Sequence, residues 1–473
     1  MRWYNIFACL SWTVLYIVGP VSMGKPPNII MLLVDDMGYG DLTCYGGQAV
    51  STPNIDQLAQ MGARYTRFYA ASAVCTPSRA AILTGRFPIR FGITKHFADD
   101  GHHLPGDTLT LATLLKNAGY ATAHVGKWHL GGLRDQDIAE RIEGRLDADP
   151  GPLQFGFQHA LTAIEGPPRA QLVAERRLYR DGGQYLVRND RPAPVDREHW
   201  ETIKVNEAIA LMEGWAGEDR PFFLNLWFDA PHTPYEPAPE PHMARATVTG
   251  ATGDQLYFRS MMSHLDSEIG RLTAYLKARG MFDDTLIIFT SDNGAAWEGE
   301  VGPFKGGKTD LHEGGLRVPF FAVWPGRIPQ NAVSFQRGHH VDLLPSICEA
   351  AGVPLEGLAL DGVSLMRDLT GRGSVIRGVL FWQMDLYGVM QRHYPKPKPF
   401  ATACVSEGPY KLLVNDRLEA IELFHLENDP REERNLLGTH GETAQALLAH
   451  VKNILAEPRS SGRRALRPEP AGR

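Results

Sequence analysis

The sequence of 473 residues has little cysteine, no marked excess of either charge and no internal repeat. Five cysteines are too few for the dense disulfide framework of a small secreted protein. A formal net charge of −6 and a pI near 6.3 provide no global attraction for nucleic acid. With 43% hydrophobic and 22% charged residues, the composition excludes a disordered chain and a multi-pass membrane protein. An anionic ligand would therefore have to be bound by a local cluster of Lys, Arg and His.

Long apolar stretches are also scarce, and the clearest one lies at the N-terminus. Ile6–Val21 is apolar and follows Arg2, which predicts a secretory signal peptide over residues 1–24. The stretch is short for a spanning helix, which needs about 20 residues, although an uncleaved anchor is the alternative. Cleavage would leave a secreted or periplasmic protein without a membrane span and with four cysteines: Cys44, Cys75, Cys348 and Cys404.

Short apolar runs that end in polar residues are typical of strands buried on both faces of a parallel sheet. Such runs cover Asn28–Val34, Phe222–Phe228, Thr285–Thr290 and Val318–Trp324. Helical patterns alternate with them at Asn54–Met61, Arg79–Leu83, Leu109–Ala118, Val205–Glu213 and Gln255–Ala278. The alternation predicts an α/β fold with a large mixed, mostly parallel sheet sandwiched by helices.

Two regions depart from this alternation. Asp135–Glu198 is rich in charge, Gly and Pro and has little periodicity, which indicates a long insertion near a binding site. After residue 375, four strand-like runs precede a helical pattern at Glu442–Leu455 and a basic, Pro-rich tail that we expect to be disordered. The four runs are Val379–Gln383, Ala401–Ser406, Tyr410–Val414 and Glu422–His425. We therefore expect a main domain over residues 25–375 and, over residues 376–473, a smaller α+β subdomain with an antiparallel sheet, a helix and the tail.

Two pairs of polar residues follow two of the predicted strands directly. Asp35-Asp36 comes after Asn28–Val34, and Asp292-Asn293 comes after Thr285–Thr290. Ligands of open α/β sheets bind at the carboxyl ends of the strands, so both pairs would lie at one sheet edge. Three carboxylates and an amide oxygen suit a hard cation such as calcium or magnesium. Turn and cap chemistry is the alternative for either pair alone.

A helix start follows at Cys75-Thr76-Pro77-Ser78-Arg79, with Pro77 in the first turn and Gly85 past the end. A helix N-terminus offers free backbone N–H groups and the positive end of the dipole, which favours an anion. Cys75 would lie at that end with Arg79 one turn further on. The alternative is an ordinary buried cysteine.

Basic residues follow other predicted strands and loops. Lys127 and His129 follow the strand-like run Ala121–Val125, and residues two apart on a strand share a face. His232 lies in a loop that flanking prolines stiffen. Lys308 lies in a Gly-rich loop that does not match the phosphate-binding loop pattern. Each of these residues alone could be ordinary surface or structural polarity.

Taken together, these residues resemble the type I, formylglycine-dependent sulfatases of the alkaline-phosphatase superfamily. The core Cys-x-Pro-x-Arg at Cys75–Arg79 would arise by chance in roughly one chain of this length in a hundred. Five further motifs occur in the family's order: Val34–Asp36, Gly126–Gly131, Pro231-His232, Ser291–Gly294 and Glu313–Gly315. The match extends to the C-terminal stretch Leu423–Leu436.

The resemblance implies a role for each residue. Cys75 would be oxidised to formylglycine by a separate maturation enzyme before folding, which leaves at most one possible disulfide. The hydrated aldehyde would attack sulfur with one hydroxyl and expel sulfate with the other, a turnover that a plain serine could not complete. The implied calcium ligands are Asp35, Asp36, Asp292, Asn293 and the modified Cys75.

The resemblance also assigns the basic residues. Arg79 and Lys127 would hold the formylglycine and the sulfate oxygens, and His129 would act as the base. His232 and Lys308 would lie at the leaving oxygen, where one of them acts as the general acid. One departure concerns a serine that some members place beside the catalytic histidine, because no serine occurs between His129 and His232.

Two other functions remain as alternatives. A formylglycine-dependent phosphonate or phosphodiester hydrolase would share Cys75 and the metal site, and a non-catalytic binding protein could keep the fold. Secretion and the polar insertion favour a sulfated saccharide, such as a glycosaminoglycan or polysaccharide fragment, as the substrate. A second polar group could contact it: Arg90, His96, His102 and His103.

Overall fold

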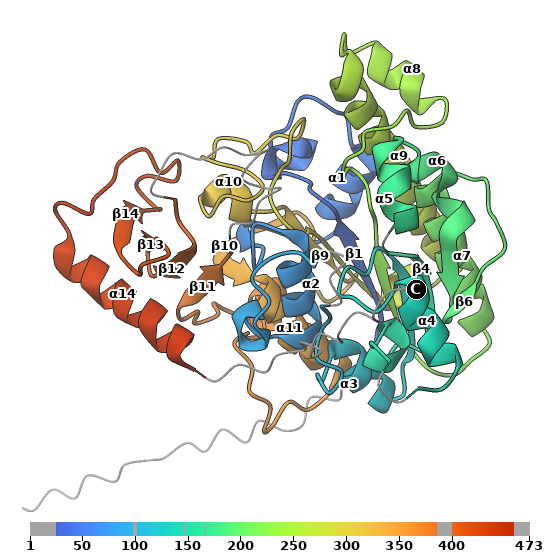
Figure 1. Cartoon of the computed structure of the whole chain (residues 1–473), viewed down its shortest axis with the longest axis horizontal. Coiled ribbons are helices and arrows are strands. Elements are labelled where there is room, and N and C mark those ends of the chain that lie inside the picture. The colour runs from blue at the N-terminus through green and yellow to red at the C-terminus, as the bar shows by residue number, and fades with distance from the viewer. Residues whose placement is uncertain (1–24, 98–101, 146–147, 166, 386–399, 458–473) are drawn as a thin grey trace, which may run out of the picture.

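The computed structural model describes residues 25–457 except 98–101, 146–147, 166 and 386–399 (Figure 1). The predicted signal peptide over residues 1–24 and the tail over residues 458–473 lie outside the described residues. Among the helices of the described part, none has the length and apolar character that a membrane crossing requires. None of the four cysteines in that part, Cys44, Cys75, Cys348 and Cys404, forms a disulfide.

A ten-stranded sheet forms the main domain and confirms the predicted α/β class. Its five central strands, in the order β8, β1, β7, β3 and β4, run parallel. Strand β9 breaks the parallel pattern, because it runs antiparallel to both β2 and β8. In order across the sheet, the strands are β10 (Ala332–His339), β2 (Ala63–Tyr69), β9 (Phe320–Val323), β8 (Thr285–Ser291), β1 (Asn28–Val34), β7 (Phe222–Trp227), β3 (Ala121–Gly126), β4 (His159–Ala163), β5 (Leu186–Arg188) and β6 (Arg191–Pro192).

The side chains of the central strands point alternately to the two faces of the sheet, and each face carries a hydrophobic core. Helices cover both cores. Ile30, Leu32 and Val34 of β1 face one core, whereas Ile29 and Met31 face the other. The first core is covered by α1 (Pro53–Gln60), α7 (Trp200–Trp215) and α9 (Gly253–Ala278), with α8 (His242–Thr247) packed on α9. The second is covered by α2 (Cys75–Thr84), α3 (Leu111–Asn117), α11 (Leu343–Ala351) and α12 (Met366–Leu369).

A second, four-stranded antiparallel sheet and one long helix lie at the end of the molecule that Figure 1 draws in orange to red. The elements are β11 (Leu380–Gln383), β12 (Ala403–Glu407), β13 (Tyr410–Val414), β14 (Ala420–His425) and α14 (Gly441–Ala456). One face of the small sheet packs on α14 through Leu447 and Val451. The other face packs against Tyr69, Val74 and Leu316 of the main domain. The predicted antiparallel sheet with a helix is thus confirmed.

The segment 135–198 differs from the irregular insertion that the sequence predicted. It contains α4 (Asp135–Ile142), α5 (Pro167–Ala174) and α6 (Leu178–Asp181), and it supplies β4, β5 and β6 to the main sheet. These strands have two to five residues, which is too short for a detectable alternation. The sequence also gave no signal for β2 and β10, where polar residues interrupt the apolar pattern.

Candidate active site

The two polar pairs meet because β1 and β8 are adjacent parallel strands that end together. Val34 pairs with Ser291, so the residues that follow each strand leave the sheet side by side. The backbone N–H of Asp36 donates to Asp292 Oδ1 at 3.2 Å. Asp36 itself adopts a left-handed backbone conformation with φ 68°, which turns the chain sharply at the sheet edge.

Helix α2 brings Cys75 and Arg79 to the same edge. It begins at Cys75 and ends at Thr84, and Gly85, with φ 66°, follows as the left-handed cap that the sequence predicted. Cys75 Sγ lies 3.6 Å from Asp35 Oδ1. Arg79, which is fully buried, donates to Asp292 Oδ2 from Nε at 3.1 Å and from Nη2 at 2.6 Å. The helix therefore brings both the sulfur and the guanidinium into contact with the carboxylates.

Lys127 and His129 also reach this edge, but not by the predicted strand geometry. Strand β3 ends at Gly126, and His129 has φ 56°, so the two side chains leave a turn and not a strand. Lys127 Nζ pairs with Asp35 Oδ2 and lies 3.8 Å from Cys75 Sγ. The carbonyl of His129 accepts from the Thr76 hydroxyl at 3.0 Å, which fixes it beside Cys75.

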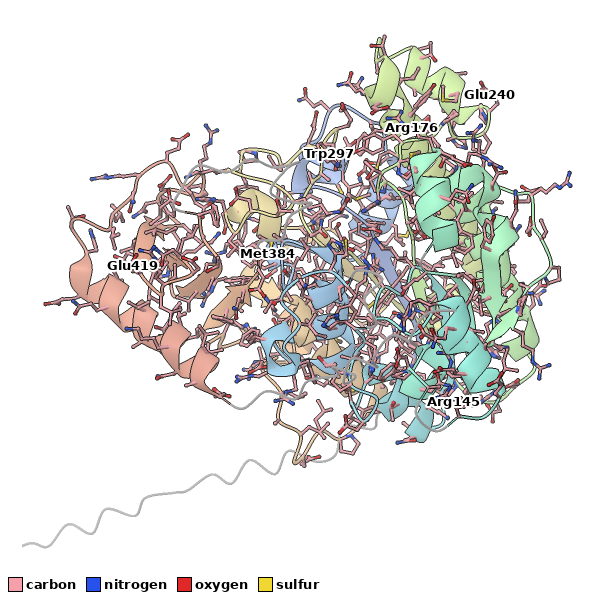
Figure 2. All side chains as sticks on the ribbon, viewed as in Figure 1. Arg145, Arg176, Glu240, Trp297, Met384 and Glu419 are labelled. Atoms are coloured by element: carbon pink, nitrogen blue, oxygen red, sulfur yellow. The ribbon has the colours of Figure 1, made fainter. Side chains whose placement is uncertain are left out.

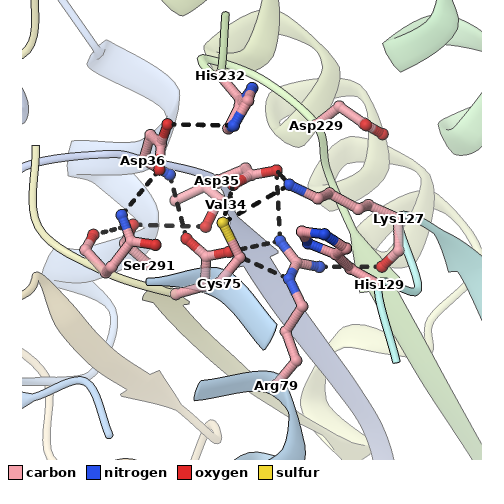
Figure 3. Close-up of polar contacts among 12 residues, drawn as sticks. Val34, Asp35, Asp36, Cys75, Arg79, Lys127, His129, Asp229, His232 and Ser291 are labelled. Atoms are coloured by element: carbon pink, nitrogen blue, oxygen red, sulfur yellow. Dashed lines mark hydrogen bonds and ion pairs between the residues drawn. The ribbon is translucent and has the colours of Figure 1, made fainter. Parts of the chain in front are cut away.

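His232 and Lys308 approach from two loops and meet at Asp36 (Figure 3 draws His232). His232 Nε2 lies 3.5 Å from Asp36 Oδ2, and Lys308 Nζ lies 2.7 Å from the same oxygen. The ten residues that the sequence predicted for the site thus converge on one place. They are Asp35, Asp36, Cys75, Arg79, Lys127, His129, His232, Asp292, Asn293 and Lys308.

Each of these two loops rests on a buried lysine that pairs with two carboxylates. Beneath His232, Lys204 Nζ lies 2.8 Å from Glu201 Oε2 and 2.7 Å from Asp229 Oδ2. Glu201 also accepts from the backbone N–H groups of Asp229 and Ala230, at 3.1 and 2.8 Å. The loop that carries His232 is therefore tied to α7 by charge as well as by packing.

The loop that carries Lys308 has a matching support from the small sheet. Lys411 Nζ of β13 lies 3.1 Å from Glu313 Oε1 and 3.0 Å from Glu432 Oε1, and all three side chains are fully buried. Glu313 begins α10 (Glu313–Leu316), which ends the Lys308 loop. Removing one member of such a buried group leaves an uncompensated charge, so these contacts hold the loop strongly in place.

The carboxylates differ in their affinity for a proton. Burial opposes ionisation of Asp35, but Lys127, His232 and Arg79 outweigh it and hold the pKa of Asp35 well below its usual range. Burial likewise opposes ionisation of Asp36, and Lys308 and His232 lower its pKa nonetheless. Burial raises the pKa of Asp292 to about 7, and the charge of Asp35 adds to the rise. A further cation would relieve this excess of buried negative charge at Asp292.

The basic groups divide into charged and neutral ones. Burial opposes protonation of both lysines, yet Asp35 raises the pKa of Lys127 and Asp36 holds the pKa of Lys308 well above its usual range. Burial and Lys127 hold the pKa of His129 well below its usual range, and burial and Lys308 lower the pKa of His232 to about 4. Burial raises the pKa of the Cys75 thiol far above neutrality, so the free cysteine is not a thiolate nucleophile.

The donor atoms at the sheet edge fit a hard metal ion. Ligand atoms of Asp35, Asp36, Cys75 and His232 lie within 4.8 Å of one another. Asn293 is fully buried, and its Oδ1 has no hydrogen-bond partner among the described residues, although its Nδ2 donates to Asp36 Oδ1 at 2.8 Å. Oxygens of carboxylates and of an amide are the ligands that calcium and magnesium prefer. The residues present therefore fit a divalent cation at this position.

Of the second polar group that the sequence suggested, one member, His96, lies beside a residue of the site. The other members are Arg90, His102 and His103. The ring of His96 lies 6.0 Å from that of His129, and burial together with Lys308 and Lys127 lowers the pKa of His96 to about 4. Arg90 instead pairs with Asp361 at 2.8 Å and with Glu457, and His103 lies 3.6 Å from Asp149. His102 stacks on Phe97.

The sequence analysis did not single out Glu165, which contacts the site, or Trp297, which lies on the loop that leads from Asn293 to Lys308. Glu165 Oε1 accepts from the backbone N–H of His129 at 3.0 Å, in the region where the serine is absent. Trp297, labelled in Figure 2, is 52% exposed and has φ 45°. Tyr235 holds the backbone on both sides of Trp297, through Ala296 O at 3.3 Å and Glu298 N at 3.4 Å. Only its place four residues after Asn293 could have marked this tryptophan in the sequence.

Comparisons with known proteins agree in one family. The model of the family described as Sulfatase matches residues 27–353, and that described as N-sulphoglucosamine sulphohydrolase, C-terminal, matches residues 299–461. Arylsulfatase A of Homo sapiens is 34% identical over 466 residues, covering 91% of this chain and 87% of its own. N-acetylgalactosamine-6-sulfatase of Canis lupus familiaris is 33% identical over 407 residues, covering 80% of this chain and 74% of its own.

Solved structures with the same fold include enzymes of related kinds. Ps i-CgsB in complex with k-i-k-neocarrahexaose superposes with a TM-score of 0.78 at 25% identity, covering 92% of this chain and 94% of the other. The phosphonate monoester hydrolase of Agrobacterium radiobacter superposes with a TM-score of 0.62 at 22% identity, covering 91% and 95%. The second likeness concerns the fold alone.

Proposed function

Since this chain belongs to the sulfatase family of the alkaline-phosphatase superfamily, we propose that it removes sulfate from sulfated carbohydrates with a nucleophile formed from Cys75. It is an enzyme, a sulfuric ester hydrolase. The observation that carries the rest of the proposal is the convergence of Cys75, Arg79 and Lys127 on two buried carboxylates, those of Asp35 and Asp292. Such a cluster offers both an anion-binding face and a position for a metal.

The nucleophile in this proposal is Cys75 after its oxidation to formylglycine by a maturation enzyme. Formylglycine supplies a hydrated aldehyde, whose hydroxyl can attack sulfur where a protonated thiol cannot. Two observations support the modification: burial keeps the thiol protonated, and Cys75 is only 2% exposed. A maturation enzyme could not reach a side chain so deeply buried, so the oxidation would precede folding.

Calcium is the proposed metal, held by Asp35, Asp36, Asp292, Asn293 and the modified Cys75. A bound calcium ion would supply positive charge that offsets the charge of the sulfate ester. The raised pKa of Asp292 supports a cation at this position, as does Asn293 Oδ1, for which the described residues supply no hydrogen-bond partner. Hard oxygen donors favour calcium or magnesium over zinc.

Three residues of the cluster would bind and activate the ester. Arg79 is held by Asp292 and by the Lys127 carbonyl, to which Nη1 donates at 2.9 Å, so its charge is fixed beside Cys75. Lys127 lies between Asp35 and Cys75 and remains protonated there. His129 is neutral, and within the part of the chain that the structure describes its buried Nδ1 has no hydrogen-bond partner, so it can accept a proton from a hydroxyl at Cys75.

Lys308 and His232 would act on the leaving oxygen. Lys308 remains charged and can donate a hydrogen bond to it. His232 Nδ1 donates to the carbonyl of Thr233, because a carbonyl only accepts, so Nε2 faces the site and would carry the transferred proton. A bound sulfate ester is an anion and favours the protonated form of His232 that a general acid needs.

A carbohydrate is the proposed substrate class. The N-acetylgalactosamine-6-sulfatases named among the relatives act on a sugar, and Ps i-CgsB binds an oligosaccharide. In this chain, the half-exposed Trp297 offers a ring on which a sugar can stack, on the loop between Asn293 and Lys308. His96 offers a second polar contact beside His129.

The remaining parts of the proposal concern processing and domain boundaries. Residues 1–24 would be removed as a signal peptide, which places the enzyme in a secreted or periplasmic compartment. Residues 25–375 would form the catalytic domain and residues 376–473 the C-terminal subdomain and tail. Contacts of Lys411 with Glu313 make the subdomain part of the support of Lys308.

Mass spectrometry of the peptide that contains Cys75, together with a substrate panel, tests the proposal. Protein from a host with the maturation enzyme should show a loss of ~18 Da at Cys75, which is the thiol-to-aldehyde change. It should release sulfate from sulfated saccharides in a calcium-dependent way. An unmodified thiol in active protein would refute the nucleophile, and activity restricted to aryl or steroid sulfates would refute the substrate class. Faster turnover of a phosphodiester would favour the alternative hydrolase.

A further inference from the structure

A buried tyrosine outside the reacting cluster contacts the loop that carries His232. The hydroxyl of Tyr179 lies 2.9 Å from the carbonyl oxygen of Asp229 and 2.7 Å from that of His232. The Asp229 carbonyl also accepts from the N–H of His232 at 2.9 Å, which closes a tight turn. Tyr179 is fully buried, so its single hydroxyl proton is shared between these two carbonyls without competition from bulk water.

Tyr179 is itself held at a fixed place. It belongs to α6, in the segment between β4 and α7, and its backbone N–H donates to Glu236 Oε1 at 3.1 Å. Its ring stacks on that of His199, with centroids 5.6 Å apart and planes 22° apart. The contacts with Asp229, His232 and Glu236 place this one residue against both ends of the loop.

The hydrogen bond from Tyr179 to the His232 carbonyl affects the direction in which the His232 ring points. The His232 carbonyl belongs to the peptide that leads into Thr233, and the Thr233 carbonyl accepts from His232 Nδ1. Restraining the first peptide therefore restrains the acceptor that selects the ring tautomer and points Nε2 toward Asp36. The hydrogen bond from the Tyr179 hydroxyl to the His232 carbonyl thus restrains the position of Nε2, the atom that would transfer the proton.

We propose that Tyr179 is a positioning residue for His232, whose hydroxyl aligns the general acid with the leaving oxygen without touching the substrate. This inference rests on the proposed function, and it gives the segment 135–198 a role in catalysis. Misalignment of an acid by even a small angle slows proton transfer, and the rate matters most when the leaving oxygen is strongly basic. The consequence is a dependence on leaving group that packing alone would not produce.

The test is Tyr179→Phe, which removes the hydroxyl and keeps the buried ring. The kcat of the modified, calcium-loaded enzyme is measured on a series of aryl sulfates whose phenols span a wide range of pKa. We expect kcat to fall about tenfold for the most basic phenol and less than about twofold for the most acidic one, with KM unchanged. Tyr185→Phe, in the same segment, is the matched control and should leave the series unchanged.

A double-mutant cycle with His232→Ala separates positioning from a general loosening of the fold. If Tyr179 acts through His232, adding Tyr179→Phe to His232→Ala should lower kcat no further. An equal loss across the whole series, an additive loss in the double variant, or no loss at all would each overturn the inference while leaving the sulfatase intact. A wild-type enzyme that releases sulfate from neither the aryl sulfates nor sulfated saccharides would instead refute the proposed function, and the inference would fail with it.

Discussion

The two ends of the active site are built differently. The residues of the sheet-edge cluster have exposed fractions of only 0–7%. They are Asp35, Asp36, Cys75, Arg79, Lys127, Asp292 and Asn293. At the leaving-group end, the side chains of His232 and Lys308 are 25% and 11% exposed, and Trp297 is 52% exposed. The sheet-edge cluster is fixed by strand ends and a helix start, whereas the leaving-group end stands on loops that buried ion groups support.

This difference separates two tasks. The sheet-edge cluster contains Cys75, the proposed nucleophile, so a change there should affect the rate on every substrate equally. In the proposed mechanism, the leaving-group end faces the alcohol that is attached to the sulfate, so the effect of a change there should depend on the alcohol. Deep burial also makes the first end sensitive to acid and to loss of a cation, because buried charge is stabilised only by its partners.

Loss of the metal is the largest effect that we expect. Chelation should lower kcat/KM by at least ~10³-fold on all substrates alike, because the proposed cation would support the sulfate end of the site. Adding calcium should restore activity and raise the Tm, since a ligand at 100 times its Kd stabilises by about 2.7 kcal/mol. Asp35→Ala should abolish both responses, as read by sulfate release and differential scanning fluorimetry.

Asp361→Asn is the matched control for that variant. Asp361 also pairs with an arginine, Arg90, but lies away from the sheet-edge cluster. It should keep the full response of Tm to calcium. If Asp35→Ala kept that response, the cation would have to bind elsewhere and the assignment of the cluster would be wrong.

Lys308→Met probes the leaving-group end and should have the next largest effect. Without its charge, we expect kcat to fall by about 10²–10³-fold for basic leaving groups and far less for acidic phenols. Lys305→Met on the same loop is the control, because Lys305 pairs with Glu422 at 3.2 Å and is 43% exposed. A loss of kcat that is the same for all leaving groups would show that Lys308 does not act on the leaving oxygen, and the two ends of the site would then not have separate tasks.

Acid should lower the free energy of unfolding through a buried histidine near the sheet-edge cluster. His340 is fully buried, and its Nδ1 accepts from Ala71 N at 3.2 Å. Burial lowers the pKa of His340 from 6.5 to about 3. The folded state therefore binds the proton less well than the unfolded chain, so stability is complete above pH 6.5 and falls as the pH drops toward 3. The loss is about 1.4 kcal/mol per pH unit for this one group.

His340→Asn keeps an acceptor near the Nδ1 position and removes the titration. Between pH 6.5 and pH 5, the wild type should lose about 2 kcal/mol more unfolding free energy than this variant, measured by urea denaturation. His450→Asn, at a half-exposed histidine on α14, should lose as much as the wild type. Identical pH slopes for wild type and His340→Asn would show that another group controls acid unfolding.

Local chemistry explains which parts the sequence could predict. Asn28–Val34 is a strand with the predicted bounds because a fully buried parallel strand is a continuous apolar run. The helix from Cys75 to Thr84 was marked by Pro77 and Gly85, whose backbone preferences are local. Because β1 and β8 are neighbours, the predicted meeting of Asp35 with Asp292 followed from the edge rule for open sheets.

Contacts between distant segments explain the rest. Tyr179 and Asp229 are 50 residues apart, and Lys411 and Glu313 are 98 residues apart, so no local pattern announces either contact. Strand β9 is antiparallel although its apolar run resembles those of the parallel strands, since direction depends on the connection and not on composition. The approach of His129 was predicted for the wrong reason, because its left-handed turn replaces a strand.

The smallest effect that we expect comes from Trp297, and it sharpens the comparison most. Trp297→Ala should lower kcat/KM about tenfold on a sulfated saccharide and less than about twofold on a small aryl sulfate, because the proposed contact is with the rest of a saccharide, which a small aryl sulfate lacks. Trp297→Tyr should recover most of the saccharide activity, whereas Trp324→Ala, at a distant and less exposed tryptophan, should not change the ratio. Equal losses on both substrates would mean that Trp297 supports the neighbouring Asn293 and not the saccharide, and the substrate class would then rest on the relatives alone.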